Sequence, residues 1–116
     1  MYTYAIYQIR PGDAGHYYRF MDMDHLRKHG MAVQPALYDM VFEGPVSSQM
    51  AALGTDNLLE LLYHRFNEEI PKDFAGHSMS VSDVIVLSGN GEVRAYYVTS
   101  FGFEEVPEFA AHITEA

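Results

Sequence analysis

Residues 76–103 read GHSMSVSDVIVLSGNGEVRAYYVTSFGF, and this stretch decides the fold. Two runs rich in β-branched and aliphatic residues, 82–87 and 93–99, flank the pair Asn90-Gly91. Asn-Gly favours the positive φ angles of a type I′ turn, so the stretch predicts a β-hairpin. The turn sets a register in which Val84 opposes Tyr97, Ile85 opposes Tyr96, Val86 opposes Ala95 and Leu87 opposes Arg94.

The predicted hairpin is apolar on both faces. Side chains alternate between the two faces of a strand. One face therefore carries Val84, Val86, Val93, Ala95 and Tyr97, and the other carries Ile85, Leu87, Tyr96 and Val98. We expect the hairpin to be central in its sheet and covered on both sides, or on one side plus a partner.

Two further strands are predicted from alternating patterns. The side chains of residues 2–9 alternate between the two faces of a predicted strand, and both faces carry apolar side chains. Residues 37–43 alternate as a half-buried strand near an edge of the sheet, with Tyr38, Met40 and Phe42 inward.

Two helices are predicted from apolar side chains at helical spacing, over residues 20–29 and 57–66. Residues 46–54 read as a polar loop, and Pro107 suits the first turn of a short C-terminal helix. The order is therefore β-α-β-α-β-β in one domain of residues 1–116. This order favours an α+β fold, with a single mixed sheet of about four strands, two helices packed on it and a C-terminal β-hairpin. Parallel pairing is possible where a connection contains a helix.

Composition limits the classes of function. No apolar run approaches the length of a transmembrane helix. The N-terminus has no basic region or cleavage site of a secretory signal. The absence of cysteine removes disulfides, thiolate catalysis and cysteine zinc sites. We expect a cytoplasmic domain without a cofactor.

The net charge is −9, and the acidic excess lies after residue 34, where three basic residues accompany thirteen acidic ones. This balance argues against binding to nucleic acid and to anionic membranes. The acidic charge is compatible with binding to a basic protein partner. It is also compatible with a charge that only keeps the domain soluble.

A set of residues between 66 and 103 resembles the signature of the YodL-like family. The set is Phe66-Asn67, Pro71, Asp73-Phe74, Gly76-His77-Ser78, Ser80-Val81-Ser82-Asp83-Val84, Tyr97-Val98 and Ser100-Phe101-Gly102-Phe103. The run GHS-x-SVSDV is its most specific part, and the resemblance extends from about Tyr4 to Phe109. Thr99 departs from the pattern, because the family frequently has Asp before Ser-Phe-Gly-Phe.

The resemblance implies a small bacterial domain, found alone or within larger proteins and often encoded on mobile elements of Gram-positive bacteria. It implies no enzymatic activity, and it suggests an accessory or interaction role by association. If the frequent Asp has a role in the family, Thr99 puts that role in doubt for this chain.

Three clusters have residue types that carry chemistry. His25 and His29 are four apart on a predicted helix, with Asp22 before them, as metal ligands would be. Arg27 and Lys28 between them would repel a cation, so a solvated polar face and no metal is the favoured interpretation.

The second cluster is the segment from His77 to Asp83, which has the residue types of a hydrolase triad. Triad members usually come together from distant parts of a chain, and no G-x-S-x-G elbow is present. We expect these side chains instead to bond local backbone groups where a strand begins.

The third cluster, Ser100-Phe101-Gly102-Phe103, echoes an aromatic RNA-binding motif but lacks its basic residue and is followed by Glu104-Glu105. We expect Gly102 to bend the chain while Phe101 and Phe103 pack on the sheet.

We predict a non-catalytic accessory or protein-interaction domain, a monomer or weak oligomer with an unidentified protein partner. The candidate binding surface is His77, Ser78, Ser80, Ser82, Asp83, Phe101 and Phe103. One alternative is a small hydrolase or metal-dependent enzyme that uses His77 with Asp83, or His25 with His29. Another is an acidic mimic of nucleic acid.

Overall fold

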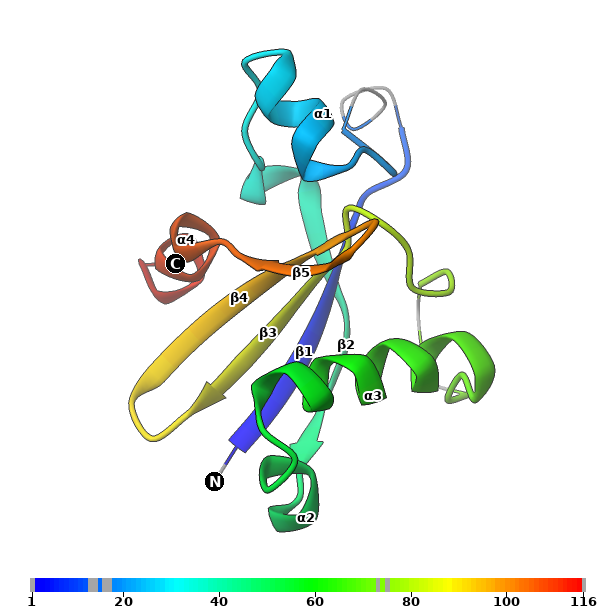
Figure 1. Ribbon diagram of the computed structural model, residues 1–116, viewed down its shortest axis with the longest axis vertical. Helices are drawn as coiled ribbons and strands as arrows, with labels where there is room; N and C mark the ends of the chain where they lie inside the picture. Colours follow the sequence, from blue (N-terminus) through cyan, green and yellow to red (C-terminus); the bar gives the residue numbers. More distant parts are fainter. Residues whose placement is uncertain (1, 13–14, 16–17, 73, 75, 116) are drawn as a thin grey trace.

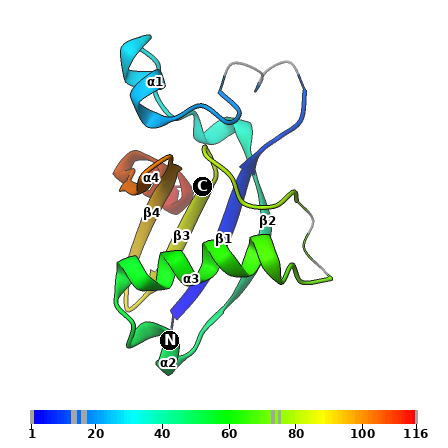
Figure 2. The same cartoon turned by 45° about the vertical axis from the view of Figure 1, so that its right-hand side comes forward.

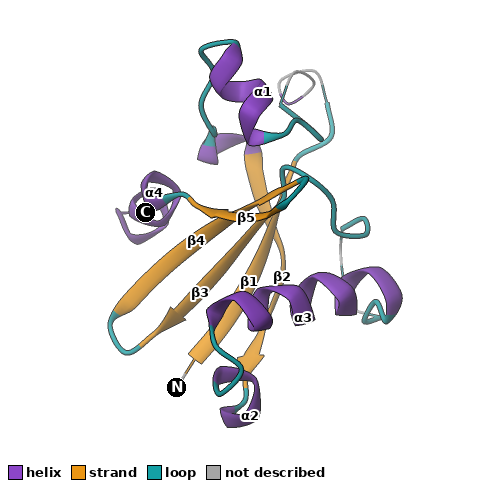
Figure 3. Cartoon of the chain, in the orientation of Figure 1, coloured by secondary structure: helices purple, strands orange, loops and turns teal. Residues whose placement is uncertain are grey.

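A computed structural model describes residues 2–12, 15, 18–72, 74 and 76–115. Five antiparallel strands form one sheet in the order β2-β1-β3-β4-β5 (Figure 1). The strands are β1 (Tyr2–Ile9), β2 (Tyr38–Val46), β3 (Val84–Gly89), β4 (Glu92–Thr99) and β5 (Gly102–Glu105). The helices within the described residues are α1 (Met23–Lys28), a 3-10 turn η2 (Pro35–Leu37), α2 (Ser48–Ala51), α3 (Thr55–Glu68) and α4 (Pro107–Glu115) (Figure 3).

The hairpin of β3 and β4 has the predicted register. Val84 pairs with Tyr97, and the pairing continues without a shift to Gly89 and Glu92. Asn90 and Gly91 have φ angles of 53° and 79°, as a type I′ turn requires. β3 lies at the centre of the sheet, so the expected central position is confirmed for this strand.

The predicted sheet of about four strands with mixed pairing and a terminal hairpin is wrong. After β4 the chain turns again and β5 pairs back along it, from Thr99 with Gly102 to Tyr96 with Glu105. Gly102, with a φ of 146°, permits this reversal, which is a strand-to-strand turn and not the predicted simple bend. The helical connections also do not create parallel pairs, because β1 lies between β2 and β3 and is antiparallel to both.

Helices cover both faces of the sheet. Figure 2 shows α3 lying across one face, and the buried residues Leu59, Leu62 and Phe66 of α3 pack with β-strand residues such as Ile6 and Ile85. The opposite face packs against α4 and α1, through Phe109 and Leu26 among others. The two apolar faces predicted for the hairpin therefore belong to two separate core clusters.

The inward positions predicted for the second strand are only partly correct. The pairing of β1 with β2 shifts between Ile6, which opposes Phe42, and Tyr7, which opposes Met40. A bulge of this kind changes the face to which the following side chains point. Tyr38 therefore lies in the core on the α4 side and Phe42 packs on the α3 side, while Met40 is half exposed.

The helices differ from their predicted limits at both ends. α1 begins only at Met23, because Phe20 has a φ of 65° and Asp22 caps the helix. α3 extends beyond its predicted range at both ends, and it buries Leu58, Leu59, Leu62 and Phe66. α2 occupies part of the expected polar loop, and the expected C-terminal turn is the helix α4. No helix among the described residues is both long enough and apolar enough to cross a membrane.

Candidate functional site

The signature segment after Gly76 closes over Gln8 of β1. Gln8 is only 2% exposed. Its Nε2 donates to the carbonyl oxygen of His77 at 2.8 Å, and its Oε1 accepts from the backbone N–H of His77 at 3.1 Å. A Cβ atom on residue 76 would lie 2.0 Å from Oε1 of Gln8, so only glycine fits there without movement. The glycine of the signature is therefore required by the buried amide of Gln8.

Asp83 lies at the other end of this segment and is 1% exposed. Its Oδ2 accepts from Nε2 of Gln8 and from the backbone N–H of Ser80, both at 3.0 Å. The backbone N–H of Asp83 donates to the carbonyl oxygen of Ser80, and its own carbonyl accepts from Val98 at 2.8 Å. Burial raises the pKa of Asp83 to about 7, although the hydrogen bonds from Ser80 and Gln8 oppose the shift.

Ser82 has a left-handed backbone, with a φ of 85°, and bonds to several separate parts of the chain. Its Oγ accepts from the backbone N–H of Phe20 at 2.9 Å, and its carbonyl accepts from the Tyr38 hydroxyl at 2.7 Å. Its N–H donates to the carbonyl of Val98. Ser80 differs, because its Oγ is buried and has no hydrogen-bond partner among the described residues. The expected bonding to local backbone thus holds for the Asp83 side chain, whereas the Ser82 side chain bonds the distant backbone of Phe20.

His77 and Asp83 do not form the catalytic pair that was considered as an alternative. The described hydrogen bonds of the Asp83 carboxylate go to Gln8 and Ser80, whereas His77 is exposed and its ring contacts Phe20 edge-on at 5.6 Å. Nδ1 of His77 lies 2.7 Å from the carbonyl oxygen of Ser78. Because a carbonyl only accepts, Nδ1 carries the proton, and its 3.4 Å approach to Nε2 of Gln8 is a contact between two donors.

The predicted binding surface is divided by the fold. Ser82 and Asp83 are buried, so they attach the segment to the core of the domain and are not exposed on its surface. His77 and Ser78 are exposed on it. Phe101 and Phe103 lie elsewhere, at the turn between β4 and β5 and at the start of β5.

Phe101 is 93% exposed, which is the highest value among the exposed large apolar side chains. The prediction that it packs on the sheet is therefore wrong, whereas Phe103 is half-buried and contacts the ring of Tyr63 at 6.3 Å. Residues two apart in a continuous strand point to the same face, so the two phenylalanines differ because Phe101 lies in the turn and only Phe103 lies in β5.

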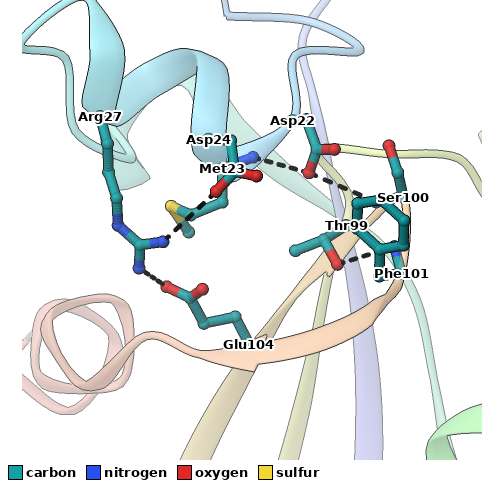
Figure 4. Close-up of polar contacts among 8 residues, drawn as sticks. All are labelled: Asp22, Met23, Asp24, Arg27, Thr99, Ser100, Phe101 and Glu104. Carbon is teal, nitrogen blue, oxygen red and sulfur yellow. Dashed lines mark hydrogen bonds and ion pairs between the residues drawn. The ribbon is translucent and has the colours of Figure 1, made fainter.

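The turn that carries Phe101 is held from two sides (Figure 4). Oγ1 of Thr99 accepts from the backbone N–H of Phe101 at 3.2 Å. Oδ1 of Asp22 accepts from the N–H of Ser100 at 3.3 Å and from the N–H of Met23 at 2.9 Å, so the same carboxylate caps α1 and fixes the turn. Hydrogen bonds from Ser100 lower the pKa of Asp22 below its ordinary value.

Thr99 stands where the resemblance to the family leads us to expect Asp. A threonine hydroxyl accepts a hydrogen bond from the N–H two residues later, as an aspartate carboxylate does in an Asx turn. Thr99 therefore retains a side-chain cap on this turn. It does so without adding a second negative charge beside Asp22.

A concavity of about 290 Å³ adjoins Phe101. Tyr63, His64 and Glu60 of α3 line one side of it, and the turn and Phe103 line the other. His64 lies 3.6 Å from a carboxylate oxygen of Glu60 and 3.8 Å from one of Glu68. We use the name Phe101 surface for Phe101, Phe103, Tyr63, His64 and Glu60.

His25 and His29 are exposed on α1, with ring centroids 4.4 Å apart. Within the part of the chain that the structure describes, no three His, Asp or Glu side chains gather closely enough to hold a metal ion. Arg27, which lies between them in sequence, pairs with Glu104 of β5 and so links α1 to the sheet (Figure 4).

Sequence reasoning missed three residues that shape these sites. Gln8 is the polar member of an otherwise apolar face of β1, Tyr4, Ile6 and Gln8, and that interruption was the available signal. Asp22 directly precedes the apolar positions of α1, as a capping residue does. Tyr63 has no comparable signal, because its role depends on how α3 crosses the sheet.

The fold and these sites define a small α+β domain with an antiparallel sheet, in which the segment Gly76-His77-Ser78 is hydrogen-bonded through His77 to Gln8 of the first strand. The chain belongs to the YodL-like domain family, since the family model matches residues 3–109. No curated protein matches the chain. No solved structure matches it either.

Proposed function

We propose that this domain is a non-catalytic binding module that engages another protein through the Phe101 surface. The observation that carries the proposal is the exposure of Phe101, at 93%, on a turn held by side chains of Thr99 and Asp22. An exposed aromatic side chain held in one position is a common anchor at protein interfaces. The proposal includes an accessory role for the domain in the cytoplasm.

The neighbourhood of Phe101 supports this role. The adjoining concavity offers partly apolar walls from Tyr63 and Phe103 and polar groups from His64 and Glu60. Interfaces commonly combine an apolar centre with a polar rim. The signature segment supports the module indirectly, because Gln8 and Asp83 fix the backbone that joins α3 to β3.

The test compares wild-type protein with Phe101→Ala and Phe20→Ala as bait in a lysate of a bacterium that encodes the chain. Phe20 is the matched control, because it is another exposed phenylalanine, at 55%, and it contacts His77 and is not one of the residues of the Phe101 surface. A captured protein is then purified and its affinity is measured with each variant. We expect Phe101→Ala to weaken binding about tenfold or more, since a buried phenylalanine contributes roughly 1.5–3 kcal/mol. Equal affinity for wild type and Phe101→Ala would contradict the proposal.

A further inference from the structure

We propose that the partner of the Phe101 surface is a basic protein segment, with Lys or Arg side chains flanking the apolar group that covers Phe101. This inference rests on the proposed function and names the chemistry of the partner. It follows from the charges that surround the surface.

Acidic side chains follow the exposed side of α3 at four-residue intervals. Asp56, Glu60 and Glu68 occupy three of these positions and His64 occupies the fourth. Residues four apart lie along one side of a helix. The stripe therefore runs past the concavity, which Glu60 and His64 line.

These carboxylates differ from those on the adjoining strand. Glu104 pairs with Arg27, and Glu105 pairs with Arg94 at 3.6 Å. Among the described residues, the ion pairs of Glu60 and Glu68 go only to His64. No Lys or Arg of the described chain forms an ion pair with the stripe, so a partner can supply the missing cations.

The charge around the Phe101 surface favours a basic segment over three other kinds of partner. A second copy of the chain would bring a net charge of −9 and the same acidic stripe to the interface, and like charges oppose association. Nucleic acid phosphates would meet the same repulsion. A neutral apolar segment would cover Phe101 but would leave the acidic rim without a partner. A basic segment satisfies both the apolar centre and the rim.

The probe is a random-peptide library displayed on phage and selected on the full chain at about 50 mM salt, where charge interactions are weakly screened. We expect enriched peptides to contain an aromatic or aliphatic residue together with an excess of Lys and Arg. Synthetic versions should lose about tenfold in affinity for Phe101→Ala. They should lose about threefold or more for the double variant Glu60→Gln/Glu68→Gln, and a similar factor at about 300 mM salt.

Two control variants test whether the changes in peptide affinity are specific to the Phe101 surface. Glu43→Gln removes an exposed carboxylate from β2, at the opposite edge of the sheet, and should leave peptide affinity unchanged. Phe20→Ala should do the same. Circular dichroism and thermal unfolding show that each variant is folded.

The outcomes distinguish the two proposals. Peptides that need Phe101 but carry no basic excess and ignore the glutamine variants would overturn the basic partner and leave the proposed function standing. A dimer of the purified chain, detected by sedimentation and lost in Phe101→Ala, would also overturn the basic partner. Failure to enrich any peptide that distinguishes wild type from Phe101→Ala would count against both. Enrichment of basic peptides that depend on Phe101, Glu60 and Glu68 supports both.

Discussion

Gln8 donates a hydrogen bond of 3.0 Å to Asp83 across 75 positions of sequence, and both side chains are buried. This side-chain hydrogen bond connects Gln8, near the end of β1, to Asp83 in the loop directly before β3. Gly76 and Asp83 both belong to the run GHS-x-SVSDV, and both have a structural role in the fold.

Replacement of Asp83 tests this structural role. Asp83→Ala removes the acceptor of the Ser80 N–H and of one N–H of Gln8 Nε2, whose other N–H keeps its bond to the His77 carbonyl. We expect a loss of about 1–3 kcal/mol in the free energy of unfolding at pH 7. Asp83→Asn keeps one oxygen acceptor and should lose less. Chemical denaturation measures both, and an Asp83→Ala variant as stable as wild type would contradict the structural role.

The raised pKa of Asp83 makes stability depend on pH in a defined direction. The folded state raises this pKa from about 3.8 to about 7, so the folded protein holds the Asp83 proton more tightly than the unfolded chain does. The stabilisation is complete below about pH 4 and is lost as the pH rises towards 7. Wild type should therefore gain stability relative to Asp83→Asn as the pH falls from about 8 to 4. Denaturation curves of both proteins at several pH values measure the difference, and no change across this range would show that Asp83 titrates normally.

Gly76 tests the close fit over Gln8. Gly76→Ala places a methyl group 2.0 Å from Oε1 of Gln8, so the amide or the loop must move. We expect a loss of roughly 1–3 kcal/mol in stability, as overpacking usually costs. The same substitution in a Gln8→Ala background should cost clearly less, because the clashing group is gone. Equal costs in both backgrounds would show that the two residues are not coupled.

The sequence predicted the hairpin well because its information is local. Asn90-Gly91 defines the turn, and the flanking strands then pair residue by residue. β5 was missed because residues 102–105 are few and show no alternating apolar pattern, and they become a strand only by pairing with β4. The opposite faces of Tyr38 and Phe42 were missed because a bulge depends on the partner strand.

The candidate site was predicted only in part, for a related reason. The bond from the Ser80 N–H to the Asp83 carboxylate follows from residue types close to a strand entrance. The distant partners of Asp83 and Ser82 are Gln8, Tyr38 and Phe20, which come from other parts of the chain and leave no local pattern. Composition also favours a buried Phe101, and the structure exposes it because a four-residue turn has no sheet surface beneath it to cover that side chain.

The turn of the β3–β4 hairpin gives the sharpest test of how the sheet is specified. Gly91 has a φ of 79° and open space where a side chain would lie, so any cost of substitution comes from the backbone. Both faces of the hairpin are apolar, and a one-residue slip would exchange them, so the turn must fix the register. Gly91→Val should therefore destabilise the protein by roughly 1–3 kcal/mol. Gly91→Asn is the matched control and should cost less, because Asn tolerates the left-handed conformation in the same open space. Amide hydrogen exchange should be slowest in β3 and β4, at residues 84–87 and 95–98, in wild type and should accelerate there in Gly91→Val. If the slowest amides lie in α3 while the hairpin exchanges freely, the hairpin is not the most stable part of the fold.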